Sequence, residues 1–216
     1  LTALAEVWRD PTVVAAVETE MGRERERAAD NEGAIARFAA ALGADPASLA
    51  ASAGLVRAAT RGRKIHEAVD AWERLGAALD ATPEGHAARY RQARLLNWRL
   101  SRAADAARVL AELPETPATL LALADAGRDL KDGALVARAL SGLAASAQGV
   151  SRAQALTEIA EATAQEAAAD AEALLRDALD QSPTFAPARV RLEALLRQQA
   201  DGSRLAQLYA AVAEDA

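Results

Sequence analysis

The sequence predicts an all-α fold in which antiparallel helix pairs repeat along the chain and stack as a solenoid. The main observation is a spacing of 34 residues in the segment from Gly33 to Pro83. Three kinds of residue recur at that spacing: small at Ala34 and Ala68, branched aliphatic at Ile35 and Val69, and large aromatic at Phe38 and Trp72. A period of this length is typical of an array of helix-turn-helix repeats.

The small and the large residue have complementary roles in such an array. A single helix pair cannot bury its apolar face, so neighbouring pairs share a core. Alanine lets the second helix of a pair, helix B, approach the first helices, helices A, on both sides, and it favours helix formation. The aromatic residue four positions later lies on the same face and fills the space between repeats. We therefore expect Ala34, Phe38, Ala68 and Trp72 to be buried.

On these residues the chain resembles the tetratricopeptide repeat family. Ala34 and Ala68 match the small residue that the family places early in helix B. Met21 and Gly22 match its large-then-small pair in helix A, and Pro46 stands where the family has a proline after helix B. The resemblance implies a right-handed α–α superhelical solenoid of about six repeats, which acts as a protein-binding scaffold. It also implies that the A helices line a concave face that receives partner peptides or helices.

Taken in order, the pattern extends over the whole chain as a single solenoid domain. We expect repeats at residues 15–48, 49–85, 86–116, 117–150, 151–185 and 186–216, with residues 1–14 ending a preceding repeat. The pattern is clear in repeats one, two, five and six and looser in repeats three and four. Pro114 and Pro117 break the chain there and leave a short helix B. This proline break and the 146–150 loop are the candidate hinges.

Composition limits the class of protein. The 216 residues are 51% hydrophobic but only 3% aromatic, so the core must be built from close contacts between alanine-rich helices. The absence of cysteine excludes a disulfide framework and a thiolate metal site. A formal net charge of -6 disfavours non-specific binding to nucleic acid. No uncharged run approaches the roughly 20 residues that span a bilayer, so we expect no membrane insertion.

The source and extent of the chain are indicated by its composition and its first residues. The sequence begins at Leu1 within a helical pattern, which indicates a fragment of a longer protein. Lys64 and Lys131 are the only lysines, and the wealth of alanine and arginine is typical of a GC-rich genome. We expect a bacterial protein of the cytoplasm or periplasm.

No motif in the chain indicates catalysis. There is no glycine-rich phosphate loop and no Gly-x-Ser-x-Gly elbow. His66 and Glu67 are followed by Asp70 where a zinc protease has its second histidine. His86 follows a predicted helix start and is expected at the surface. We therefore expect no enzymatic activity, no metal and no cofactor.

Arginines recur at two inward-facing positions of the predicted A helices. Arg23, Arg57 and Arg94 share one position in three successive repeats, and Arg27 and Arg61 share a second. Such arginines suit an acidic or carboxylate-bearing peptide, which guanidinium groups bind bidentately. Tyrosine and tryptophan nearby would add anchors of the type enriched at interfaces. The predicted partner-binding set is Arg23, Arg27, Arg57, Arg61, Tyr90, Arg94, Asn97 and Trp98.

Three alternatives stay open. The arginines could be ordinary surface side chains paired with Glu20, Glu24 or Glu26. The repeats could present substrates to a catalytic module of a larger enzyme, or they could assemble as homo-oligomers through exposed solenoid ends. Chaperone binding is not expected, because that subclass of the family uses a Lys and Asn carboxylate clamp, and Thr19 and Arg23 stand at the matching positions.

Overall fold

The computed structural model describes residues 10–164 and 167–214, with side chains described up to residue 210. These residues form twelve α-helices and no β-strand, which confirms the predicted all-α class. The helix end predicted at residues 1–9 lies outside the described residues. Contacts divide the chain into two compact units, Leu1–Pro114 (unit 1) and Glu115–Ala216 (unit 2). The division falls within the predicted proline break.

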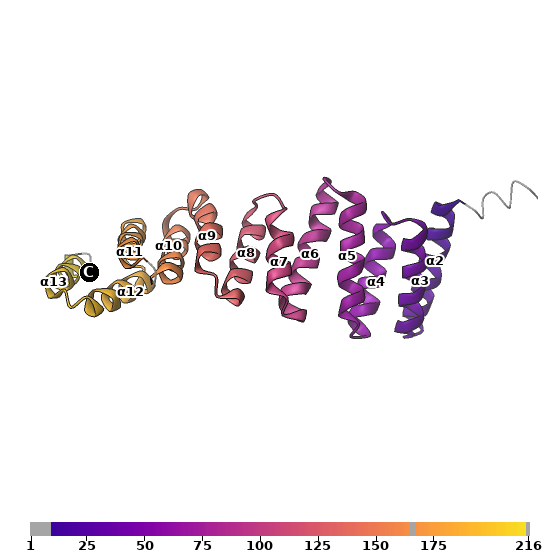
Figure 1. The fold of residues 1–216 in the computed structure, drawn as a ribbon, viewed down its shortest axis with the longest axis horizontal. Coiled ribbons are helices and arrows are strands. Elements are labelled where there is room, and N and C mark those ends of the chain that lie inside the picture. Colours follow the sequence, from indigo (N-terminus) through magenta and orange to yellow (C-terminus); the bar gives the residue numbers. More distant parts are fainter. Residues whose placement is uncertain (1–9, 165–166, 215–216) are drawn as a thin grey trace, which may run out of the picture. The chain divides into compact units, whose positions relative to one another are not determined.

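Unit 1 contains three consecutive helix pairs. Each helix packs on the next one along the chain, and α2 also packs on α4, as adjacent repeats of a solenoid do (Figure 1). The A helices are therefore α2, α4 and α6, and the B helices are α3, α5 and α7. Their bounds are α2 (Pro11–Arg27), α3 (Asn31–Ala44), α4 (Leu49–Arg61), α5 (Ile65–Leu79), α6 (Pro83–Leu100) and α7 (Ala103–Ala111).

Unit 2 repeats this arrangement with three further pairs. Consecutive helices again pack on each other, and α10 packs on α12 across the helix between them. The A helices are α8, α10 and α12, and the B helices are α9, α11 and α13. Their bounds are α8 (Pro117–Leu130), α9 (Gly133–Ser146), α10 (Gly149–Thr163), α11 (Ala168–Gln181), α12 (Ala186–Gln198) and α13 (Gly202–Glu214).

Prolines begin three of the A helices. The residues before them, Asp10, Thr82 and Thr116, cap the helices by accepting a backbone N–H with their side chains. Proline suits the first helical position because its missing N–H would have no intrahelical partner there. Helix α6 consequently begins at Pro83, three residues before the repeat boundary expected from the sequence.

The aromatic position of the first repeat lies in a socket made of backbone. Phe38 on α3 has no exposed surface, and neither has Ala34. A Cβ atom added to Gly22 of α2 would lie 2.6 Å from Phe38 Cε1, and one added to Gly54 of α4 would lie 2.4 Å from the same atom. The ring is therefore in direct contact with glycine backbone on both flanking A helices. The predicted role of this position, to fill the space between repeats, is confirmed.

The aromatic position of the second repeat is covered differently. Ala68 is fully buried, whereas Trp72 keeps 8% of its surface exposed. The indole packs in a cluster with Leu75 and Ala88. The guanidinium of Arg91, on α6, lies 5.0 Å from the centre of the indole and covers it from outside. A cation over an indole face is a favourable arrangement.

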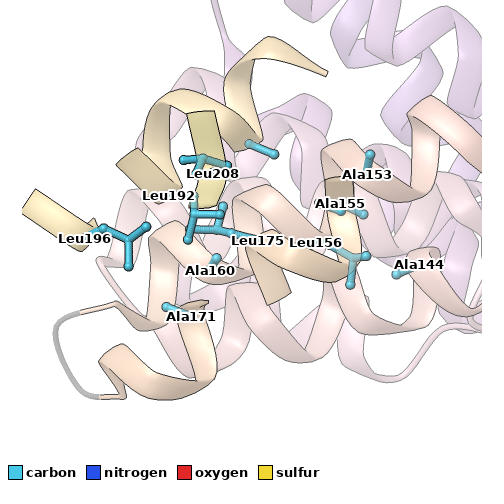
Figure 2. Close-up of a cluster of buried hydrophobic side chains, with 12 residues drawn as sticks. Ala144, Ala153, Ala155, Leu156, Ala160, Ala171, Leu175, Leu192, Leu196 and Leu208 are labelled. Carbon is cyan, nitrogen blue, oxygen red and sulfur yellow. The ribbon is translucent and has the colours of Figure 1, made fainter. Parts of the chain in front are cut away.

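One core cluster of unit 2 is made of leucine and alanine. This cluster extends from α9 to α13 and includes Leu156, Leu175, Leu192 and Leu208 (Figure 2). Leucine thus occupies the position on α11 that corresponds to Phe38 on α3. Small alanines fill the spaces between these leucines, so the helices approach closely as the composition predicts.

Candidate partner-binding face

Two of the predicted arginines lie on α2 and are paired within that helix. Arg23 forms an ion pair with Glu20 and Arg27 forms one with Glu24, each three residues apart on the helix. All four side chains are exposed, Arg23 the least at 42%. Pairs of this kind at the surface contribute little to stability, and they leave each guanidinium close to a carboxylate.

Two others lie on α4 and reach across to the neighbouring repeat. Arg57 binds Glu26 of α2 bidentately, with Nη2–Oε2 and Nε–Oε1 distances of 2.9 and 3.3 Å. Arg61 donates to the same carboxylate at 3.2 Å. The Glu26 side chain is only 10% exposed. One carboxylate therefore joins α2 to α4 through two arginines, which explains in part why the two A helices stay in register.

The remaining arginine is held by aromatic rings. Tyr90, Arg94 and Trp98 are spaced by four residues along α6, so they lie on one face of the helix. Arg94 Nη1 donates to Tyr90 Oη at 2.9 Å, and Arg94 Cζ lies 3.3 Å from the centre of the Trp98 indole. Arg94 forms no ion pair with a carboxylate of the described chain. We call these three residues the α6 triad.

The α6 triad combines exposure with fixed geometry. Trp98 keeps 58% of its surface exposed, the highest value among the tryptophan, tyrosine and phenylalanine side chains that are exposed in the described chain. A guanidinium carries five N–H donors, and only one of those of Arg94 binds Tyr90. Stacking fixes the plane of the cation against the ring. Asn97, which the sequence placed in the same site, is 7% exposed and therefore offers a partner little surface.

Unit 2 uses arginine to join its A helices. Arg128 of α8 pairs with Glu158 of α10, and Arg191 of α12 pairs with Glu161 of α10. These pairs resemble the Arg57–Glu26 pair of unit 1 in joining successive A helices. The arginine content of the chain therefore has a structural use, and only some arginines are free of acidic partners.

One polar residue was missed by the sequence analysis. Gln92 is 6% exposed and lies on the side of α6 that faces α5 and α7. The sequence indicates that this glutamine is buried, because it lies between Ala88 and Leu96 at spacings of four residues and so interrupts an apolar stripe.

Neither a metal site nor a membrane span is visible in the described residues. No group of three or more His, Asp or Glu side chains there is placed to hold a metal ion. None of the described helices combines the length and the apolar character that crossing a bilayer requires.

Comparisons with known proteins identify the fold. No family model and no curated protein sequence matches the chain. Among solved structures, the MamA protein aligns at a TM-score of 0.51 and 16% identity, covering 80% of this chain and 94% of MamA. YrrB, described as a TPR protein with an unusual peptide-binding site, aligns at 0.48 and 22%, covering 87% and 94%. PilW, a type IV pilus biogenesis factor, aligns at 0.47 and 16%, covering 91% of each chain.

The likeness to MamA, together with the helix pairing, shows that the chain has a fold of the tetratricopeptide repeat type. This agrees with the resemblance found in the sequence. At identities this low the likeness concerns the fold alone, so function has to be argued from the residues of this chain.

Proposed function

We propose that this chain is a protein-binding scaffold whose partner is an acidic peptide segment docking on the A-helix face of unit 1. The α6 triad is the anchor of this site, and the arginines of α2 and α4 form its surroundings. Peptide binding by YrrB, as its description states, is compatible with this use of the fold. The chemistry of the site, however, rests on Tyr90, Arg94 and Trp98.

The main support for the proposal is that Arg94 has no carboxylate partner in the described chain. Of the five predicted arginines, the other four already have a glutamate partner, whereas Arg94 is held by a phenol and an indole. Neither group neutralises its charge. A carboxylate that approaches Arg94 therefore gains an ion pair without first breaking one, and it meets a guanidinium whose orientation is already fixed.

The exposed indole adds a second contribution. Tryptophan, tyrosine and arginine are the residues most enriched among those that dominate binding energy at interfaces. Trp98 would cover an apolar side chain of the peptide next to its carboxylate. We expect the arginines on α2 and α4 to contribute less, because a partner must compete with Glu20, Glu24 and Glu26 for them.

The test is selection from a random-peptide display library on the immobilised protein, followed by affinity measurement on the selected peptides. We expect Asp and Glu to be enriched, and binding to weaken as salt rises, because exposed charges are screened beyond about 8–10 Å at physiological ionic strength. Arg94→Gln and Trp98→Ala should each weaken binding by about tenfold or more, the loss typical of an interface anchor.

Arg27→Gln is the matched control, since it removes the same charge from an exposed guanidinium that is paired with Glu24. It should change affinity by less than Arg94→Gln does. Equal losses in the two variants would show that only overall charge matters, and unchanged binding in both α6 variants would place the site elsewhere. Circular dichroism should confirm unchanged helix content in all three.

A further inference from the structure

Three helical faces in unit 1 enclose a polar cleft that the proposed function does not use. Its volume is about 360 Å³, toward the lower end of the range for clefts that hold a small ligand or a few residues. Its lining residues come from α5, from α6 and from α7 with its two capping residues. Apart from two adjacent pairs, the lining residues on each helix recur every three or four positions, so each helix contributes one continuous face. The polar ones are Asp70, Glu73, Arg89, Gln92, Arg102, Asp105, Arg108 and Glu112.

The charges of the cleft do not cancel. Its three arginines all have acidic partners: Arg102 and Arg108 pair with Asp105, and Arg89 pairs with Asp80 and, at 3.8 Å, with Glu112. The hydrogen bond from Arg102 lowers the pKa of Asp105, which therefore stays ionised. Asp70 and Glu73, one turn apart on α5, form no ion pair within the described part of the chain. The wall formed by α5 thus presents two exposed carboxylates without counter-ions.

The floor of the cleft holds an amide without a partner. Gln92 is 94% buried, as the complement of its 6% exposure, and its side chain forms no hydrogen bond with any described residue. The amide atoms are not among the buried, unpartnered side-chain atoms of the described chain, so they remain accessible from the cleft that Gln92 lines. A side-chain amide offers one acceptor and two donors. This matches the N–H and C=O groups of a peptide unit in an extended strand.

We propose that this cleft binds an extended peptide segment that carries lysine or arginine. The Gln92 amide pairs with a backbone peptide group of the segment, and the basic side chain lies against Asp70 and Glu73. Val69 and Leu96, both buried at the base of the cleft, provide an apolar floor for the peptide backbone and the methylene groups.

This second site is independent of the acidic-peptide site. With about 3.6 residues per turn, positions 89, 92 and 96 lie on the opposite side of α6 from positions 90, 94 and 98. Helix α6 would then contact two peptides of opposite charge, one on each of its sides. Variants of the α6 triad should leave the cleft unaffected, so failure of one proposal does not imply failure of the other.

The test is fluorescence anisotropy with a labelled Gly-Lys-Val-Lys-Gly amide on the full chain, with the glutamate version of the peptide as a negative control. We expect the lysine peptide to bind and the glutamate peptide not to bind. Asp70→Asn combined with Glu73→Gln should weaken binding by about tenfold, as expected for the loss of two exposed ion pairs. Gln92→Leu should also weaken binding while changing the melting temperature little, because it replaces an amide that has no partner in the described chain with an apolar side chain of similar size.

Two controls separate the cleft from general attraction to an acidic protein. Glu84→Gln with Glu115→Gln removes two exposed charges outside the cleft and should leave affinity nearly unchanged. In a ¹⁵N-labelled sample, the side-chain amide signal of Gln92 should shift as the peptide is added. The proposal is overturned if the two double variants weaken binding equally, or if Gln92→Leu binds normally and the Gln92 signal stays in place.

Discussion

The first two repeats place an aromatic side chain at the same position and enclose it in different ways. Phe38 lies between Gly22 and Gly54 and is fully buried. One period of 34 residues later these positions are Val56 and Ala88, and both pack in the cluster around Trp72. The indole of Trp72 is larger than the ring of Phe38, but the residues on its two sides are larger than glycine and leave it less space. Trp72 stays partly exposed, and Arg91 covers it.

The comparison extends to unit 2, where leucine takes the place of the ring. Leu175 of α11 belongs to a cluster whose other buried members are all leucine or alanine. A branched aliphatic side chain fits between alanine-lined helices without a glycine socket. The repeat thus fixes the position of the filling residue, while its size is matched locally by the residues that face it.

The largest expected effect is loss of the filling residue itself. Phe38→Ala and Trp72→Ala should each lower the free energy of unfolding by about 3–5 kcal/mol, and Leu175→Ala by about 2–5 kcal/mol. Phe38 should lie toward the upper end, because its ring is enclosed on both sides and the cavity cannot fill with neighbouring side chains. Chemical denaturation of the three variants measures this. If Phe38→Ala unfolds at the same denaturant concentration as the parent protein, the Phe38 ring is not packed between the two glycines as described.

A smaller effect should follow from closing the glycine socket. Gly54→Ala places a Cβ 2.4 Å from the buried ring of Phe38 and should cost about 1–3 kcal/mol through overpacking. Gly43, on α3, has nothing within 4 Å of an added Cβ. Gly43→Ala should therefore be neutral or stabilise by up to about 1 kcal/mol through helix propensity. If the two substitutions have the same effect on stability, the close contact between Gly54 and Phe38 does not restrict the size of residue 54.

Local stability should differ between the aromatic repeats and the segment with the prolines. Stability in a solenoid is a sum of repeat and neighbour terms. The segment from Ala111 to Val150 begins at the last residue of the short helix α7 and includes the proline break. We expect its amides to exchange faster than those from Ala34 to Leu79, as measured by native-state hydrogen exchange. Equal protection in both segments would show that the two units unfold together.

The smallest expected effect concerns Asp105, whose pKa is lowered from its ordinary value of 3.8 chiefly by the hydrogen bond from Arg102. A lowered pKa adds stability that is present above the unfolded-state value and lost as pH falls through the folded-state value. An NMR titration should place the Asp105 midpoint below 3.8. Arg102→Gln should raise that midpoint. A midpoint at or above the ordinary value in the parent would contradict the assigned bond.

The sequence predicts the fold well because its signals are local or periodic. The spacing of 34 residues identified the helix pairs, and the alternation of small and large residues identified Ala34, Phe38, Ala68 and Trp72 as core. Helix α6 begins at Pro83, ahead of the expected repeat boundary at residue 86, because a proline after one helix can equally be the first residue of the next. Spacing alone does not separate these two roles.

The site was predictable only in part. The alternative that pairs arginine with Glu20 and Glu24 follows from spacing within one helix, and the structure has those pairs. Which helix Glu26 would reach depends on how α2 and α4 pack, and its bonds to Arg57 cross 31 residues. The stacking of Arg94 on Trp98 likewise depends on rotamers that sequence does not encode.

The measurement that tests the central claim most directly is an NMR titration of the protein with an acidic peptide taken from the display selection. The claim is that the α6 triad is the anchor of the partner-binding face. The indole N–H of Trp98 and the guanidinium N–H signals of Arg94 should shift progressively and give the same dissociation constant as the bulk binding curve. Saturation of binding with both signals unmoved would contradict the claim.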